Sequence, residues 1–322
     1  MSKSIVIGVD VGGTFTDTLA LDEATGAVRV EKVPSTKGDQ SNGFLSGILA
    51  ATDHDLSSVS TIIHGTTVAT NALLERKGAK AGIITTEGFR DVLEMRRRDR
   101  PSTWGLWGQF TPVIERKCRL EVPERTLANG TVVKDVDEAS IKAAAQDLIA
   151  QGCESVCLFF INGYANTDNE TKAARILRQV WPNDYVSVAT EILPEIREFE
   201  RCSTASLNAY LQPVVANYLA RLETRIAEDD AGSEILIVQS NGGIMSVDTA
   251  KALPVRTALS GPAAGVVAAR QIAKAAGFEN VITCDMGGTS FDVSLVADGQ
   301  NMLTSQASID FGMVIRTPMI EM

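Results

Sequence analysis

The chain has 322 residues, a formal net charge of −10 and a hydrophobic share of 44%. This length predicts about two domains, and the acidic balance, without a long basic stripe, argues against nucleic acid as a partner. No apolar run reaches the roughly 18 residues of a membrane-spanning helix, and the N-terminus leads straight into a predicted strand instead of a signal peptide. We therefore expect a cytoplasmic protein with no membrane partner.

The first third of the chain alternates predicted strands and helices. Residues 1–33 predict three strands in a meander, with turns at Gly12-Gly13 and near Gly26. Such an alternation favours a sheet covered by helices. Further along we expect a helix over 41–51, a strand over 61–63, a helix over 67–77 that stops at Gly78, a strand over 81–85 and a helix over 89–98.

Residues 99–136 break this rhythm. We interpret the basic run Arg96-Arg97-Arg98 as a solvated helix end or as a contact with a phosphate or an acidic partner. The aromatic cluster Trp104, Trp107 and Phe110 is either a lid or subunit contact, or a loop packed on its own domain. Asn129-Gly130 predicts a hairpin.

A β-α-β pattern extends the first predicted domain to about residue 190, and a long helical stretch leads into the second. The predicted domains are therefore 1–190 and 191–322. The expected elements are a helix over 137–151 capped by Asp137, a strand over 155–160, a helix over 170–180, a strand over 185–189, a helix over 196–228 bent near Pro213, a strand over 234–239, a helix over 261–275 and a strand over 301–304.

The cysteines predict buried thiols in a reducing compartment, because they are scattered and Cys157 lies in the apolar run 156–160. With only His54 and His64 as histidines, the sequence shows no zinc-ligand cluster. The cysteines are Cys118, Cys153, Cys157, Cys202 and Cys284.

One pattern, D-x-G-G-T-x-x-D, occurs twice, at Asp10–Asp17 and at Asp285–Asp292. Each copy lies between two apolar runs, so both predict a strand, a tight glycine turn and a strand. Glycines let backbone N–H groups approach an anion, and successive N–H groups form an anion-binding concavity, to which a threonine hydroxyl adds a donor. Two such hairpins facing each other would hold one polyphosphate from both sides. The predicted phosphate-binding residues are Gly12, Gly13, Thr14, Gly287, Gly288 and Thr289.

Two ordinary glycine turns are the alternative, but the matched positions in a matched strand context favour phosphate binding. No Walker P-loop pattern is present. Asp10 and Asp285, at strand ends, are predicted to act in catalysis by organising Mg²⁺ through its waters, because Mg²⁺ prefers oxygen ligands and keeps several waters. Asp17 and Asp292 have two interpretations, one as metal support and one as turn stabilisers.

A third motif, His64-Gly65-Thr66-Thr67, lies where a predicted strand meets a helix N-terminus. Free N–H groups and the helix dipole favour an anion there. We predict that Gly65 and Thr66 bind phosphates of the cofactor, and that His64 and Thr67 act on the transferred phosphoryl group. A buried, hydrogen-bonded histidine is an equal interpretation of His64.

The duplicated pattern resembles the two phosphate loops of the actin and hexokinase ATPase superfamily. Together with His64–Asn71, Glu121–Arg125 and Ser260–Gly265, it resembles more closely the hydantoinase A / 5-oxoprolinase family. The resemblance implies an α/β fold of two ribonuclease H-like, actin-like ATPase domains, with the second incomplete in this chain. The small residues after Ser260 resemble the helix that links the two domains of that superfamily, although Pro262 near a helix start is also a routine placement.

The resemblance also implies a function. Members of this family use ATP, with Mg²⁺, to phosphorylate the amide oxygen of a small cyclic amide such as hydantoin, N-methylhydantoin or 5-oxoproline, which opens the carbon to attack by water. They commonly act with a hydantoinase B-type subunit or domain, so an oligomer is expected. Most of the adenine pocket is expected outside this chain.

Three alternatives stay open. Close relatives phosphorylate a ketone enol for carboxylation, so a ketone carboxylase subunit is one of them. A small-molecule kinase of the same superfamily is the second, although the His64–Asn71 and Ser260–Gly265 motifs argue against it. A non-catalytic nucleotide-binding assembly subunit is the third.

Overall fold

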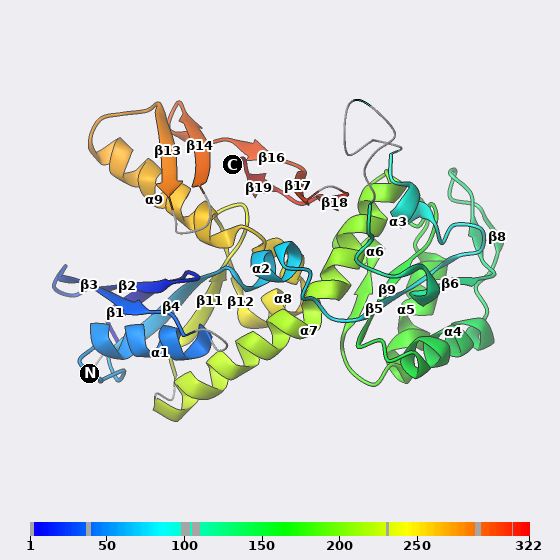
Figure 1. The fold of residues 1–322 in the computed structure, drawn as a ribbon, viewed down its shortest axis with the longest axis horizontal. Helices are drawn as coiled ribbons and strands as arrows, with labels where there is room; N and C mark the ends of the chain where they lie inside the picture. The colour runs from blue at the N-terminus through cyan, green and yellow to red at the C-terminus, as the bar shows by residue number, and fades with distance from the viewer. Residues whose placement is uncertain are drawn as a thin grey trace. The chain divides into compact units, whose positions relative to one another are not determined.

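The computed structural model describes residues 3–36, 40–97, 104, 110–229, 232–286, 291–310 and 312–322. It separates into two compact units, and Figure 1 shows each of them. Unit 1 comprises Met1–Thr70, Val215–Ser305 and Pro318–Met322, and unit 2 comprises Asn71–Val214 and Gln306–Thr317. Two helices continue across the boundary, α2 (Val68–Leu74) and α7 (Glu198–Asp229). No helix in the described ranges is long and apolar enough to cross a membrane.

Unit 1 is built on a mixed sheet with the strand order β12-β11-β4-β1-β2-β3. The central strands β1, β4 and β11 are parallel, while β2, β3 and β12 run antiparallel to their neighbours. The predicted three-strand meander is confirmed. The strands are β1 (Ile5–Val11), β2 (Phe15–Asp22), β3 (Val28–Pro34), β4 (Val59–Thr66), β11 (Glu234–Val238) and β12 (Ile244–Ser246).

Helix α1 (Gln40–Ala51) covers this sheet at close range. Strand β2 alternates exposed and buried residues, which turns Thr16 and Thr18 toward the helix. A methyl group on Gly43 or Gly47 would lie 2.9 Å or 2.4 Å from the hydroxyl oxygen of Thr16 or Thr18, respectively. The two helix glycines therefore set how closely α1 packs on β2.

The remainder of unit 1 pairs a helix with a second hairpin. Helix α9 (Ser260–Ala275), which confirms the predicted helix over 261–275, packs on β13 and β14. Ala263, Val266, Val296 and Ile320 form their small buried core. The predicted strand over 301–304 is two short strands, because β15 pairs with β14 whereas β16 pairs with β19. The elements are α8 (Val247–Ala252), the 3₁₀ turn Pro254–Thr257, β13 (Val281–Met286), β14 (Phe291–Ala297), β15 (Gln300–Asn301), β16 (Leu303–Thr304) and β19 (Met319–Ile320).

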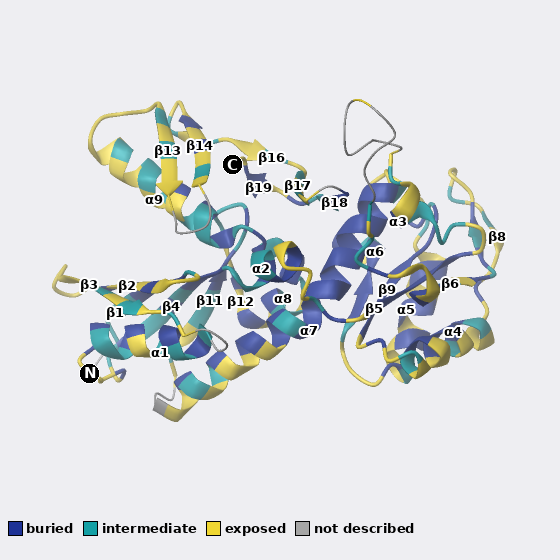
Figure 2. Cartoon of the chain, viewed as in Figure 1, coloured by how far each residue is buried: buried dark blue, intermediate teal, exposed yellow. Residues whose placement is uncertain are grey.

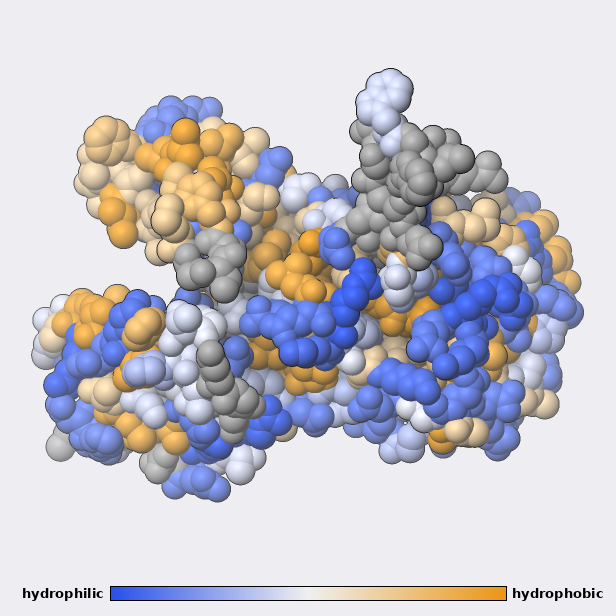
Figure 3. All heavy atoms as spheres, viewed as in Figure 1, coloured by the Kyte–Doolittle hydropathy of each residue, from blue (hydrophilic) through white to orange (hydrophobic). Residues whose placement is uncertain are grey.

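The hairpin β13–β14 exposes large apolar side chains. Its cross-strand pairs include Ile282 with Leu295 and Met286 with Phe291. These four side chains are 51% to 79% exposed, and Figure 3 shows hydrophobic surface gathered over this hairpin and α9. Contiguous apolar surface of this kind is typical of interaction surfaces.

Unit 2 contains a parallel sheet with the strand order β10-β9-β5-β6. Every residue of β5 and β9 is buried, as expected for parallel strands covered on both faces. The first half of α7 is also almost wholly buried in this unit (Figure 2). The strands are β5 (Ala81–Thr86), β6 (Arg119–Val122), β9 (Ser155–Phe159) and β10 (Val186–Val188). The helices are α3 (Val92–Met95), the 3₁₀ turn Arg116–Cys118, α4 (Glu138–Ala150), α5 (Asp168–Val180) and α6 (Ala189–Ile192).

Local sequence patterns predict the ends of several of these elements. The carboxylate of Asp137 accepts a hydrogen bond from Ser140 N at 2.9 Å and caps α4, and Gly152 follows that helix with φ 77°. Gly130 turns the predicted hairpin with φ 83°, between β7 (Arg125–Thr126) and β8 (Val132–Lys134). A further hairpin joins β17 (Ala307–Asp310) to β18 (Met313–Ile315).

Two predicted helices are shorter than expected. The helix predicted over 89–98 forms only as α3, because Gly88 (φ 86°) precedes it and Arg96 (φ 51°) ends it. The helix predicted over 67–77 stops at Leu74, and Arg76 follows with φ 53°. Helix α7 contains Pro213, as predicted. Arg98 and Trp107 lie outside the described residues.

The compact units divide the chain differently from the predicted boundary at residue 190. Strands β11 and β12 lie beyond that boundary, yet they complete the sheet that begins at Ile5. Conversely, the segment Gln306–Thr317 packs with unit 2. Pairing between strands distant in sequence, which local patterns do not encode, is the physical reason for this difference.

Replacing Gly78 with alanine should destabilise unit 2 by about 1–3 kcal/mol through overpacking. A methyl group there would lie 2.1–2.4 Å from ring atoms of Tyr210, whose side chain is buried. Chemical denaturation of the two proteins measures the change. Gly8→Ala is the matched control, because no atom lies within 4 Å of that added methyl, and equal stability losses in both variants would refute the clash.

Candidate functional site

The two copies of the repeated pattern form hairpins with the same register. Asp10 pairs with Asp17 between β1 and β2, and Asp285 pairs with Asp292 between β13 and β14. The first and last residues of each pattern thus lie directly opposite each other. The strands predicted on both sides of each turn are confirmed. Residues 287–290, which include Gly287, Gly288 and Thr289, lie outside the described residues.

The first turn is held by its own backbone and by Ser35. Gly12 N donates to Phe15 O at 3.0 Å, and a methyl group on Gly12 would lie only 3.0 Å from that same oxygen. The Ser35 hydroxyl donates to Gly12 O at 2.8 Å, and Ser35 N donates to Thr14 O at 2.9 Å. The turn containing Gly13 is therefore fixed in place. The sequence patterns did not single out Ser35.

The carboxylate of Asp10 lies between two glycines from distant parts of the chain. A methyl group on Gly65, in β4, would lie 3.3 Å from Asp10 Oδ1, and one on Gly261, in α9, would lie 3.2 Å from it. The added methyl of Gly65 would also lie 3.6 Å from the Cα atom of Gly261. Three of the motifs found in the sequence therefore meet around one carboxylate.

Threonine and serine hydroxyls join these motifs to one another. The Ser260 hydroxyl donates to Thr66 O at 3.0 Å and accepts from Thr66 N at 3.3 Å. The Thr67 hydroxyl donates to Val11 O at 3.2 Å, which links the start of α2 to the end of β1. Leu259, with φ 61°, donates its N–H to the Thr70 hydroxyl at 2.9 Å. These contacts hold the ends of β1 and β4 against the start of α9.

Like charges surround the Asp10 carboxylate. Asp10 is an exposed residue, yet the backbone at Gly65 and Gly261 crowds its carboxylate. Burial, followed by the negative charges of Asp17 and Asp285, raises the pKa of Asp10 to about 6, against the opposing charge of Lys32. Lys32 is paired with Asp17, at 2.9 Å. An arrangement with this excess of negative charge suits a cation.

Mg²⁺ fits these donors as an ion held through water. Asp10 and Asp285, whose negative charges interact, could supply oxygen ligands to Mg²⁺ or to its waters. Among the described residues, no group of three or more histidine, cysteine, aspartate or glutamate side chains is arranged as a metal site. Cys118, Cys153, Cys157 and Cys202 are buried thiols, as predicted. The prediction was wrong for Cys284, which is exposed because strand β13 is largely open to solvent.

His64 is a fully buried residue with a partner at each ring nitrogen. Its Nδ1 lies 3.3 Å from Val9 O, and its Nε2 lies 2.9 Å from the hydroxyl of Tyr218. Phe44 packs edge-on against the ring, with centroids 4.8 Å apart. Burial lowers the pKa of His64 to about 4. This geometry favours the interpretation as a buried, hydrogen-bonded histidine.

His64 should therefore make the fold acid-sensitive. Its pKa is lower in the folded state, so the unfolded state binds more protons between about pH 6.5 and pH 4. The stabilising contribution of neutral His64 should be fully present above pH 6.5. The free energy of unfolding should then fall by about 3 kcal/mol as the pH is lowered from 6.5 to 4. Denaturation midpoints of the wild type and of His64→Gln across pH 4–8 measure this. An equally steep acid loss in His64→Gln would assign the effect to other groups.

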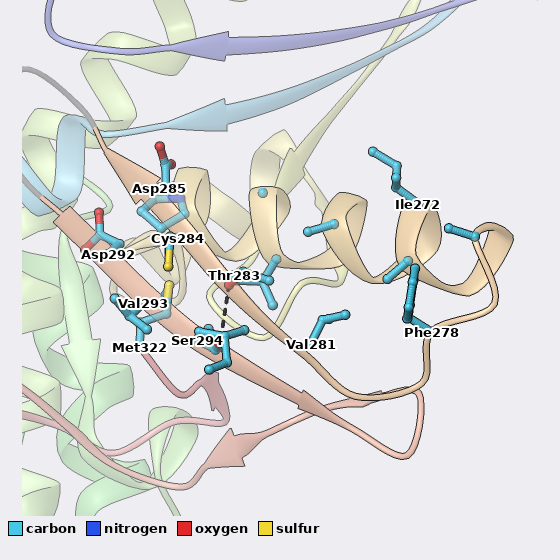
Figure 4. Close-up of a pocket in the computed structure, with 17 residues that line it drawn as sticks. Ile272, Phe278, Val281, Thr283, Cys284, Asp285, Asp292, Val293, Ser294 and Met322 are labelled. Carbon is cyan, nitrogen blue, oxygen red and sulfur yellow. Dashed lines mark hydrogen bonds between the residues drawn. The ribbon is translucent and has the colours of Figure 1, made fainter.

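A cavity of about 590 Å³ lies beside the second hairpin, between α9 and the strands β13 and β14. Figure 4 shows Asp285 and Asp292 on neighbouring strands at one end of it, while Ile272 and Phe278 lie toward the other end. The cavity is thus acidic at the predicted phosphate end and apolar beyond. The sequence patterns did not single out this cavity, because its walls come from separate elements.

The chain matches known proteins along its whole length. Residues 6–181 match the hydantoinase/oxoprolinase N-terminal region, and residues 201–322 match the hydantoinase/oxoprolinase region. The caprolactamase subunit alpha of Pseudomonas jessenii is 34% identical over 91% of this chain and 44% of its own length. The 5-oxoprolinase of Saccharomyces cerevisiae is 29% identical over 99% of this chain and 28% of its own length.

Solved structures show the same fold. The ATP-dependent caprolactamase from Pseudomonas jessenii matches with a TM-score of 0.87 and 32% identity, over 98% of this chain and 47% of that one. Nucleotide-free acetone carboxylase matches with a TM-score of 0.85 and 27% identity, over the same shares of the two chains. The chain spans less than half the length of these relatives. On this evidence the chain is a member of the hydantoinase/oxoprolinase family, with a mixed α/β fold that matches the N-terminal part of these structures.

Proposed function

We propose that this chain supplies the phosphate-binding part of an enzyme that uses ATP to open a cyclic amide. The observation that carries this proposal is the matched pair of hairpins, with Asp10 and Asp285 in one electrostatic environment. Relatives whose names include caprolactamase and 5-oxoprolinase support a cyclic amide as the substrate class. Two ribonuclease H-like domains are part of this proposal. The first hairpin would belong to one of them, and the second hairpin, although it lies in the same compact unit of this chain, would begin the other.

The backbone N–H groups at Gly12 and Gly13, with the Thr14 hydroxyl, would bind phosphate oxygens from one side. Gly287, Gly288 and Thr289 would do so from the other. Asp10 and Asp285 would hold Mg²⁺ through its waters, and the ion would neutralise charge on the phosphates. Gly65 leaves space beside the Asp10 carboxylate that a side chain would fill.

Three bond exchanges complete the proposed reaction. The amide oxygen forms a bond to the γ-phosphorus of ATP, and the bond from that phosphorus to the bridging oxygen of ADP breaks. Water then adds to the activated carbon and the ring C–N bond breaks, which leaves the ring-opened amine and an acyl phosphate. A second water hydrolyses the acyl phosphate to a carboxylate and inorganic phosphate. Because the protein mainly positions and neutralises charge in phosphoryl transfer, the chain needs no nucleophile of its own for the first step. We propose a positioning role for His64 and Thr67, through Tyr218 and Val11.

A partner subunit is part of the proposal. The caprolactamase relative is named as subunit alpha, the acetophenone carboxylase relative as a gamma subunit, and the acetone carboxylase relative as a beta subunit. We propose that this chain likewise works with a hydantoinase B-type partner.

Phosphate release from Mg-ATP by the complete enzyme, with its partner, tests the function. The panel contains 5-oxoproline, hydantoin, N-methylhydantoin, caprolactam, and acetone with bicarbonate. Stimulation by a cyclic amide is the expected result and identifies the ring. Stimulation only by acetone with bicarbonate would instead establish a ketone carboxylase, which the carboxylase relatives favour. Bound ATP without stimulation by any compound would establish a non-catalytic nucleotide-binding subunit.

A further inference from the structure

We propose that unit 2 holds a second binding site, for a small molecule that carries a carboxylate. The site is a cavity of about 690 Å³, a size common for small-molecule pockets. This site does not depend on the proposed ATP chemistry. The residues that line it are Gly88, Phe89, Asp91, Val92, Met95, Arg96, Arg97, Arg197, Glu198 and Phe199.

The sheet topology places this cavity where open parallel sheets bind ligands. From β5 the chain moves to β6 on one side of it, and then to β9 on the other side. The strand order therefore reverses between β5 and β9. Ligands of such sheets bind beyond the carboxyl ends of the strands at this switch point. One wall of the cavity is formed by residues of the loop after β5, namely Gly88, Phe89, Asp91 and Val92.

A motif that the proposed ATP chemistry does not use holds this wall. Glu121 Oε1 accepts hydrogen bonds from Gly88 N at 2.9 Å and Arg90 N at 3.3 Å. The guanidinium of Arg125 lies over the ring of Phe89, 4.8 Å from its centroid. The segment Glu121–Arg125 therefore fixes the loop after β5. A loop held by three such contacts is preorganised.

The acidic residues of the cavity wall already have partners. Arg116 forms a two-point ion pair with Asp91, with both distances 2.9 Å. Glu198 accepts from Arg201 at 2.8 Å and from Asn162 N at 2.8 Å. Their charges are therefore largely neutralised before any ligand arrives.

The basic side of the cavity has spare hydrogen-bonding capacity. Arg97 forms a two-point ion pair with the buried Glu200, at 2.8 Å and 2.7 Å. Arg197 approaches the same carboxylate only at 4.0 Å, and its side chain is 52% exposed. Within the described ranges, that approach is the one ion pair of Arg197. One carboxylate thus serves two guanidiniums, and the five donors of Arg197 are available to an anion.

Backbone strain marks two of these arginines. Arg96 has φ 51° and Arg197 has φ 119°, values that side chains with a Cβ rarely adopt. Strain of this kind persists where the surrounding structure enforces it, and it clusters at ligand sites. Both strained residues line the cavity at the topological switch point, beside the Glu200 carboxylate that Arg97 and Arg197 share.

The lining favours a carboxylate on a carbon skeleton over a phosphate. The planar guanidinium pairs with the oxygens of a carboxylate or of a phosphate alike, so the apolar part of the lining decides between them. Phe89, Val92 and Phe199 offer apolar contact to carbon atoms.

Titration calorimetry of the 322-residue chain, without ATP, tests the site. The probes are succinate, its uncharged analogue succinamide, and inorganic phosphate. We expect succinate to bind and succinamide not to bind. Arg197→Gly should weaken succinate binding at least tenfold while it preserves the fold, because glycine adopts the backbone angle at this position without strain. Arg197→Lys should restore only part of the affinity.

Arg178→Gln is the matched control, since Arg178 forms an exposed ion pair with Glu191 elsewhere in unit 2. It should bind succinate like the wild type. Absence of succinate binding, equal binding of succinamide, or unchanged affinity in Arg197→Gly would overturn the site. Equal binding of phosphate with the same dependence on Arg197 would overturn the carboxylate assignment. These outcomes do not depend on the proposed ATP hydrolysis, because the titrations contain no ATP.

Discussion

Asp10→Asn is expected to abolish substrate-stimulated ATP hydrolysis and, at the same time, to stabilise the folded chain. Loss of a group that stabilises charge in phosphoryl transfer lowers the rate by roughly 100-fold or more. The same carboxylate is unfavourable in the fold, because burial and its acidic neighbours raise its pKa to about 6. An uncharged amide removes that penalty. Lower activity with higher stability is a signature of a functional site.

The sign of the pH dependence follows from this raised pKa. Between about pH 4 and pH 6 the folded state binds more protons than the unfolded state, so stability falls as pH rises through that range. Asp10→Asn should therefore match the wild type below pH 4 and exceed it by about 1 kcal/mol above pH 6, a figure reduced for solvent screening.

Denaturation at pH 4 and pH 7, with phosphate release at pH 7, measures both parts of this prediction. Asp55→Asn is the control, because Ser57 N donates to the Asp55 carboxylate at 2.9 Å and the pKa of Asp55 is lowered. That variant should lose stability slightly and keep its activity. An Asp10→Asn protein with lower stability at pH 7, or with full activity, would contradict the assignment of Asp10.

Arg201→Met is expected to destabilise unit 2 by about 3–5 kcal/mol. Arg201 and Glu170 are both fully buried, and their nearest atoms lie 3.3 Å apart. The arginine also donates to Phe160 O at 3.1 Å and to Glu198 at 2.8 Å. Burial raises the pKa of Glu170, and the charge of Arg201 opposes that rise. Removal of the arginine leaves a buried carboxylate without its counter-charge.

Glu170→Gln should restore part of this loss in the double variant, since the amide oxygen can still accept from Thr190 N, which donates to Glu170 at 2.8 Å. Arg178→Met is the comparison, because its exposed pair with Glu191 is worth about 0–1 kcal/mol. Urea denaturation of the wild type, Arg201→Met, the double variant and Arg178→Met measures these differences. Equal losses in Arg201→Met and Arg178→Met would show that the buried pair contributes no more than a surface pair.

Local patterns in the sequence were sufficient for the elements around the first hairpin. Alternation in β2 and the glycines at its turn reflect interactions within about ten residues, so the meander was predictable. The same holds for α4, where Asp137 and Gly152 mark both ends. By contrast, the long prediction for α3 was wrong, because helix-forming residues do not reveal the positive φ at Arg96.

The site was predictable as motifs but not as an arrangement. Asp10, Gly65 and Gly261 each belong to a pattern in the sequence, yet their meeting requires β4 and α9 to lie beside β1. The buried cluster of Arg201 and Glu170 gave no signal, because charged residues in an amphipathic stretch usually face solvent. The role of His64 became interpretable only once Tyr218 was placed beside it.

The central claim is that two hairpins hold one polyphosphate. The most direct test adds Mn²⁺ with ATP to the isotopically labelled 322-residue chain and records amide NMR spectra. The account predicts that the signals of Gly12 and Gly13 broaden at the same Mn²⁺-ATP concentration as those of Gly287 and Gly288. Asp10→Asn should remove the broadening at both hairpins. Broadening at only one hairpin, or at neither, would contradict it.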